Sequence, residues 1–148
     1  MTKTNGELSH ELILQIIKTR RAFRQSVQRQ LKLNNVDMTF EMLQVMHRLW
    51  QQQGISQQQL AIQTSKDKAC LTNLIKNLVK KGWVVRSENE SDRRHKIINL
   101  TDKGEAMAGI VRPIMDGIYS ESGSKMDNGQ MLQCLGCLEK LGDIFNEI

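Results

Sequence analysis

The side chains best suited to chemistry in this sequence are the basic residues gathered between positions 56 and 101. This segment holds nine Lys and Arg residues against four Asp and Glu residues, so its net charge is +5. The remainder of the chain holds twelve basic and twelve acidic residues, which cancel. A positive excess confined to one segment favours a polyanionic partner, although a solvated basic face would carry the same charge.

Part of this charge falls on a helix predicted over residues 66–81. Apolar residues recur at intervals of three and four and should face the core: Leu71, Leu74, Ile75 and Leu78. The opposite face carries Ala69, Asn73, Lys76 and Lys80, with Lys66 and Thr72 on its flanks. Such a face suits a DNA groove, and we expect these residues to make the contacts: Lys66, Lys68, Ala69, Thr72, Asn73 and Lys76.

The residue types on this face match the known chemistry of base edges. Asn73 could bind adenine through two hydrogen bonds, and Thr72 or Ala69 could contact a thymine methyl group. Lys76 could reach a guanine edge or a phosphate. The exposed face of an ordinary amphipathic helix would carry similar residues, so this alternative stays open.

The rest of the charge falls on a predicted β-hairpin. Residues 83–86 and 96–100 are short runs rich in β-branched and aromatic side chains, joined by polar residues 87–95. We expect this hairpin to contact DNA through Asp92, Arg93, Arg94 and Lys96. A narrow minor groove attracts an inserted arginine, for which Arg94 is the candidate, with Asp92 holding its guanidinium group. A solvated basic loop is the alternative.

The segments before the hairpin are predicted to be helical. An apolar stripe predicts a long helix over residues 7–33, and Thr39 can cap a second helix, which Gly54 should end. A short helix opened by a capping box at Ser56 follows and should end near residues 64–65. We expect Ser56 and Gln57 to contact the DNA backbone.

Two helices are predicted after the hairpin. Thr101 can cap the first, and Pro113 should kink or interrupt it. Residues 120–124 form a weak linker, and Asp127 can open a capping box for the last helix. The order of elements predicts a mainly α fold with one small β-hairpin wing, a winged helix-turn-helix in a single domain over residues 1–148.

Composition argues against several other classes of protein. No apolar run approaches the roughly 20 residues of a membrane span, and the first ten residues lack the layout of a signal peptide. We therefore expect a cytoplasmic protein with no membrane partner. The three histidines are scattered, and catalytic, metal-binding or phosphate-loop spacings do not occur, so we expect no enzyme, cofactor or metal.

Two alternative functions stay open at this stage. Cys134 and Cys137 have the C-x-x-C spacing of redox motifs and could make a thiol-based sensor, although small buried cysteines inside a helix are commoner. A helical protein-interaction module without DNA would explain the long apolar helices. It would not explain the confined charge.

With these residues in view, the sequence resembles the MarR family of bacterial winged-helix regulators. Four stretches carry the likeness: Met38-Thr39, residues 56–61 (SQQQLA), residues 78–86 (LVKKGWVVR), and Asp92-Arg93-Arg94 followed by Leu100-Thr101. The last is similar to the family's D-x-R…L-T wing signature. Glu88 and Glu90 beside the arginines depart from what minor-groove insertion favours.

The resemblance implies a sequence-specific regulator of transcription, usually a repressor. It implies a homodimer held by intertwined helices at residues 1–36 and 102–148, with residues 38–101 binding double-stranded DNA at a palindromic operator. It also implies a small, often phenolic or aromatic, effector that releases DNA. The sequence assigns no residues to such an effector.

Overall fold

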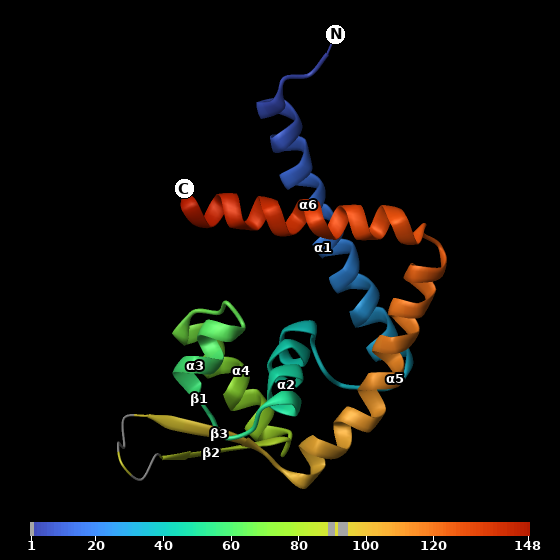
Figure 1. Ribbon diagram of the computed structural model, residues 1–148. Coiled ribbons are helices and arrows are strands. Elements are labelled where there is room, and N and C mark those ends of the chain that lie inside the picture. The colour runs from blue at the N-terminus through green and yellow to red at the C-terminus, as the bar shows by residue number, and fades with distance from the viewer. Residues whose placement is uncertain (1, 89–90, 92–94) are drawn as a thin grey trace. The chain divides into compact units, whose positions relative to one another are not determined.

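Figure 1 shows the computed structural model, which describes residues 2–88, 91 and 95–148. The chain divides into two compact units, Met1–Arg112 and Pro113–Ile148. The elements follow in order: α1 (Asn5–Leu33), α2 (Phe40–Gln51), β1 (Ile55–Ser56), α3 (Gln57–Gln63), α4 (Lys68–Lys80), β2 (Val84–Glu88), β3 (Lys96–Leu100), α5 (Asp102–Ser124) and α6 (Asn128–Glu147). The predicted mainly α fold with a small β-hairpin is confirmed.

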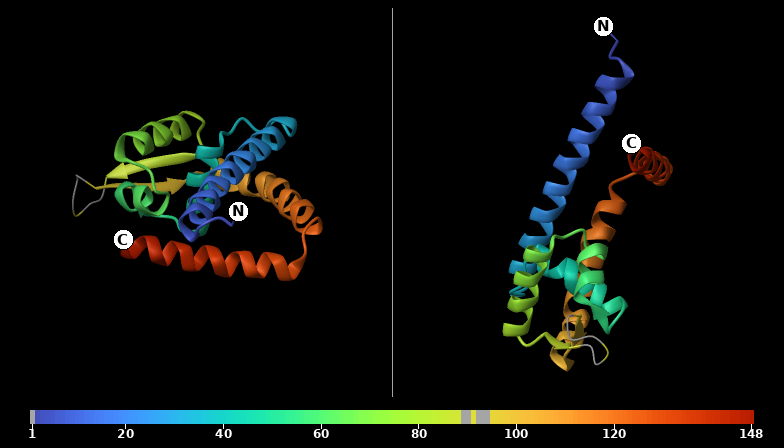
Figure 2. Two further views of the ribbon diagram at one scale, coloured as in Figure 1. Left: turned by 90° about the horizontal axis from the view of Figure 1, so that it is seen from above. Right: turned by 90° about the vertical axis from the view of Figure 1, so that its left-hand side faces the viewer.

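Helix α1 begins at a capping box and packs on the first unit only near its end. Thr4 accepts a hydrogen bond from the Glu7 amide, and the Glu7 carboxylate accepts one from the Thr4 amide, which satisfies free N–H groups of the first turn. Val27 and Leu31 are buried, whereas Leu8, Leu12 and Ile16 of the predicted stripe are exposed. The N-terminal half of α1 extends away from the other helices of this unit (Figure 2).

The core of the first unit lies where α2, α3 and α4 pack with the sheet. Its largest fully buried side chains come from all four parts: Met46, Leu49, Leu60, Leu71, Ile75, Leu78 and Ile98. Burying one such side chain contributes about 1.5–3 kcal/mol. These contacts hold α4 in one orientation, which decides the face that it offers to solvent.

The sheet has three antiparallel strands in the order β1-β3-β2. Val84 pairs with Leu100 at the base of the β2–β3 hairpin, hereafter the wing, and Ile55 of β1 pairs with Ile98. The hairpin is as predicted, but the sequence pattern missed β1. Two residues are too few to show alternation, and Ser56 also serves as the N-cap of α3.

The turn from α4 into the wing depends on Gly82. Its φ of 77° lies in the left-handed region, which glycine adopts at little cost. The amide of Gly82 donates to the carbonyl of Val79 and that of Trp83 to the carbonyl of Leu78, the pattern of a Schellman motif. The predicted end of this helix at residue 81 is therefore confirmed to within one residue, since α4 ends at Lys80 and Lys81 is its C-cap.

Three other predicted boundaries are wrong. Helix α2 ends at Gln51, and Gly54, with a φ of 69°, serves the turn into β1 instead. Helix α5 runs through Pro113 and residues 120–124, so the predicted interruption and the predicted linker are both wrong, while the alternative of a kink at Pro113 stays a prediction. Pro113 removes only one backbone hydrogen bond of the helix, which can continue past it. The linker predicted at residues 120–124 lies instead at residues 125–126, as a turn.

The second unit contains the end of α5 and all of α6. Asp127 caps α6 by accepting from the Gln130 amide, as predicted. Not one residue of α6 is buried. Met131 and Leu141 are half-buried, and its other large apolar side chains are exposed: Leu132, Leu135, Leu138, Ile144 and Phe145. Over the described part of the chain, no helix combines the length and apolar character that crossing a membrane requires.

Candidate nucleic-acid interface

The orientation of α4 matches the helical-wheel prediction. Leu71, Ile75 and Leu78 are completely buried, and Leu74 is half-buried. The opposite face is open to solvent: Ala69, Asn73, Lys76 and Lys80. This exposed face therefore combines small, amide and cationic side chains on a helix that the core holds in place.

The start of α4 differs from the prediction by two residues. Asp67 is the N-cap, and its carboxylate accepts from the Cys70 amide at 2.7 Å. Lys66 therefore precedes the helix, and its ammonium group donates to the Gln44 side-chain oxygen on α2 at 2.8 Å. Lys66 is engaged with α2, so Lys68 is the first cation of α4 itself.

A hydrogen-bonded chain joins α3 to α4. The Gln57 side-chain amide donates to Thr72 Oγ1 at 3.0 Å, and the Thr72 hydroxyl donates to the Lys68 carbonyl at 2.7 Å. Ser56 accepts from the Gln59 amide as the N-cap of α3. Of the two residues predicted to contact the DNA backbone, Gln57 thus also joins α3 to α4, whereas Ser56 caps α3.

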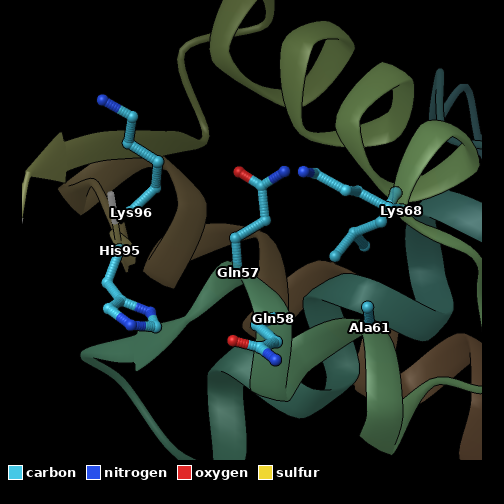
Figure 3. A pocket seen from close by; sticks show the side chains of 7 residues that line it. Gln57, Gln58, Ala61, Lys68, His95 and Lys96 are labelled. Atoms are coloured by element: carbon cyan, nitrogen blue, oxygen red, sulfur yellow. The ribbon is translucent and has the colours of Figure 1, made fainter. Parts of the chain in front are cut away.

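A hollow opens between α3, α4 and the wing. Its volume is about 440 Å³, and it is lined by Gln57, Gln58, Ala61, Lys68, Leu71, His95 and Lys96. Figure 3 shows Gln57 in the middle of this α3–wing hollow, with Lys68 on one side and His95 and Lys96 on the other. Predicted contact residues from three separate segments therefore surround one space.

A second hollow, of about 430 Å³, lies between α4 and β2. It is lined by Thr72, Ile75, Lys76, Val79, Lys80 and Arg86. Sequence reasoning counted Lys80 and Arg86 in the basic segment but did not name them as contact residues. The spacing of four between Lys76 and Lys80 signals a shared helix face, whereas the approach of Arg86 depends on the tertiary fold.

The wing is described only in part. Lys96 and Glu88 face each other across the strands, and their side chains form an ion pair at 2.9 Å. Asp92, Arg93 and Arg94 lie outside the described residues, so their predicted contacts stay predictions. The acidic partner of Lys96 reduces the local positive charge at the base of the loop.

The second candidate site, the C-x-x-C pair of α6, does not have the buried surroundings that were expected. Cys134 and Cys137 are both exposed, as is Cys70 on α4. The apolar neighbours of the pair, Leu135 and Leu138, are exposed as well. Within its own unit the pair is therefore not part of a packed core.

An ion pair within the first unit links α1 to α2. Arg24 Nε donates to the Glu41 carboxylate at 2.9 Å. Burial alone would raise the pKa of Glu41, but the hydrogen bond from Arg24, a backbone hydrogen bond, and the charges of Arg24 and Lys66 together hold that pKa below its usual value. Glu41 is therefore ionised at neutral pH and holds the end of α1 against α2.

Comparison with protein families finds a match at the centre of the chain. The model described as "MarR family" matches residues 39–96. The chain is 28% identical over 96 residues to the HTH-type transcriptional regulator TtmR of Methylorubrum extorquens, which is 65% of this chain and 49% of TtmR. It is 32% identical over 66 residues to SarZ of Staphylococcus epidermidis, 45% of each chain. The chain thus spans about half the length of these curated relatives.

Solved structures resemble the chain over almost its whole length. The structure titled reduced AbfR bound to DNA has a TM-score of 0.82 at 22% identity and covers 99% of this chain and 98% of its own. The transcriptional regulator PA4135 has a TM-score of 0.78 at 25% identity, with 90% and 96% covered. The likeness at such low identity shows a shared fold.

Proposed function

We propose that this protein is a homodimeric, sequence-specific DNA-binding regulator of transcription, because residues 39–96 match the model of the MarR family and nearly the whole chain shares the fold of solved MarR regulators. In this proposal residues 38–101 bind double-stranded DNA. The exposed face of α4 enters the major groove, and the wing reaches the adjacent minor groove. The simplest regulatory role is that of a repressor.

One observation carries the proposal: the packed core holds α4 so that Ala69, Asn73 and Lys76 are exposed, and two hollows with cations in their linings border this helix. Base edges are read by amide and small apolar side chains, whereas lysines and arginines position the phosphate backbone. Lys68 and Lys96 line one hollow, and Lys76, Lys80 and Arg86 line the other. A duplex at this surface would therefore meet side chains that can read bases, Ala69 and Asn73, together with cations that can contact the phosphate backbone.

The exposed apolar helices support the homodimer. Leu8, Leu12 and Ile16 lie four apart on α1 and are between 36% and 50% exposed. Residues four apart lie on one helix face, and an apolar face of this kind is normally covered by a partner. We propose that residues 1–36 and 102–148 make the dimer interface, which would also cover α6.

The names of the relatives support a regulator over an enzyme. TtmR and SarZ are named HTH-type transcriptional regulators, and two similar structures are titled as complexes of AbfR and MepR with DNA. A DNA-binding role agrees with the cytoplasmic location expected from the sequence. A small aromatic effector that releases DNA belongs to the same proposal and rests on the family resemblance.

Selection of bound duplexes from a random library tests the proposal. We expect enrichment of a palindrome whose half-sites lie about one helical turn apart. A gel shift with the selected duplex and with a shuffled duplex of the same composition then measures specificity. Equal affinity for both duplexes would contradict sequence-specific binding.

A separate experiment tests the alternative of a redox sensor at Cys134 and Cys137. It titrates the thiols of the folded protein with and without peroxide.

A further inference from the structure

We infer that Thr72 reads a thymine through its methyl group and that Gln57 is the positioning residue that keeps the Thr72 hydroxyl away from the bases. The inference rests on the proposed function and assigns one base contact within it. Both base hydrogen bonding and methyl contact are open to a threonine in a groove. The hydrogen bonds around Thr72 decide between them.

The Thr72 hydroxyl has no proton left for DNA. A hydroxyl donates one hydrogen bond, and that of Thr72 goes to the Lys68 carbonyl at 2.7 Å within α4. Thr72 therefore cannot donate to the acceptors that guanine, adenine and thymine show in the major groove. Its remaining means of recognising a base is chiefly apolar.

Gln57 holds the hydroxyl in this orientation from the neighbouring helix. Its side-chain amide donates to Thr72 Oγ1 at 3.0 Å, which uses one of the two lone pairs of that oxygen. The Gln57 side-chain oxygen is buried and has no hydrogen-bond partner among the described residues. An amide that is buried for this single contact costs free energy, which is consistent with a positioning role.

The surroundings of Thr72 suit a methyl group. Thr72 lines the α4–β2 hollow together with the apolar side chains of Ile75 and Val79. Three cations complete the lining: Lys76, Lys80 and Arg86. A thymine methyl would contact the apolar part, while the cations would face phosphates of the same stretch of backbone.

The test replaces each thymine of the selected duplex in turn by deoxyuridine, which lacks only the methyl group. Losing one buried methyl contact should weaken binding of the wild type roughly fourfold per half-site, at a single thymine position. Thr72→Val keeps a methyl group at this position, and valine has one strongly preferred χ1 rotamer in a helix without any hydrogen bond to fix it. It should therefore retain the fourfold preference. Thr72→Ser keeps the hydroxyl and should lose it.

Two further variants separate reading from folding. Gln57→Ala should reduce the preference at that same thymine, because the Thr72 side chain is no longer fixed. Thr64→Val is the matched control, since the Thr64 hydroxyl likewise donates to a carbonyl one turn earlier, that of Leu60, at 2.7 Å. Thr64→Val should leave the preference unchanged, and thermal unfolding checks that all variants are folded.

The outcomes are distinguishable. A preference lost in Thr72→Val but kept in Thr72→Ser would show that the hydroxyl reads the base and would overturn the inference. A preference that no Thr72 variant changes, or a selected half-site without thymine, would overturn it too while leaving DNA binding intact. Absence of any duplex binding would refute the proposed function itself.

Discussion

Replacing Gly104 with alanine should destabilise the protein, although alanine is the better helix former. A Cβ atom on Gly104 would lie 2.0 Å from the backbone oxygen of Trp83, whereas real Cβ contacts essentially never fall under 3.0 Å. Backbone cannot rotate away as a flexible side chain would, so the start of α5 must move from the root of the wing. Trp83 is also 5% exposed, so the crowded atom is in the packed interior.

The expected loss follows from three contributions. Overpacking typically costs about 1–3 kcal/mol. The movement of α5 also strains two hydrogen bonds of 3.0 Å, one from the Thr101 amide to the Trp83 carbonyl oxygen and one from Trp50 Nε1 to the Gly104 carbonyl oxygen. Each such bond contributes about 1 kcal/mol. The higher helix propensity of alanine returns about 1 kcal/mol. We expect a net loss of about 2 kcal/mol of unfolding free energy.

Urea unfolding at matched protein concentration measures this loss, because the proposed dimerisation would make stability depend on concentration. The midpoint should fall while the slope m stays constant. Gly109→Ala is the matched control in the same helix, since a Cβ there meets nothing within 4 Å. It should gain up to about 1 kcal/mol. A Gly104→Ala protein as stable as the wild type would refute the reasoning about this close approach.

Three further results are expected. In an anisotropy titration, Lys76→Ala should weaken binding to the selected duplex and reduce the slope of log affinity against log salt by about 1 for each lost phosphate contact. Lys125→Ala is the control, because the Lys125 ammonium group lies in the turn before α6 and pairs with Glu121; it should leave affinity and slope unchanged. In urea unfolding, Asp67→Ala should lower the free energy of unfolding by about 1 kcal/mol because α4 loses its N-cap, whereas Asp67→Asn, which can still cap the helix, should retain most of the stability. Equal losses in the two variants would show that capping is not the cause. Because the pKa of Glu41 is lower in the folded than in the unfolded protein, its ionised carboxylate stabilises the fold above the unfolded-state pKa, and this stability is lost as pH falls through the folded-state pKa. Glu41→Gln should remove this part of the pH dependence of the thermal unfolding temperature, and an unchanged dependence at acidic pH would contradict the prediction.

Local sequence patterns are sufficient to predict most of the residues that α4 exposes to solvent. The recurrence of Leu71, Ile75 and Leu78 defines a buried face, so the opposite face follows from helix geometry alone. The helix boundary needed more information. Asp67 lies between two lysines with no apolar neighbour to signal the cap, and the prediction therefore placed Lys66 inside the helix.

Contacts between distant residues could not be predicted in this way. Gln57 and Thr72 are 15 positions apart, and Trp50 and Gly104 are 54 apart, so no local period encodes either bond. The same holds for Arg86, which reaches the surface of α4 only because the wing folds back beside it. The contacts of Arg93 and Arg94 stay predictions from sequence.

Dimethyl sulfate footprinting of the selected duplex, which methylates guanine N7 in the major groove and adenine N3 in the minor groove, tests most directly whether the exposed face of α4 and the wing contact DNA together. The expected result is two symmetric protected regions about one helical turn apart, each with protection of a major groove and of the adjoining minor groove. The double variant Asn73→Ala, Lys76→Ala should abolish the major-groove protection before the minor-groove protection. A single protected region, or a footprint that this double variant leaves unchanged, would contradict the proposed interface.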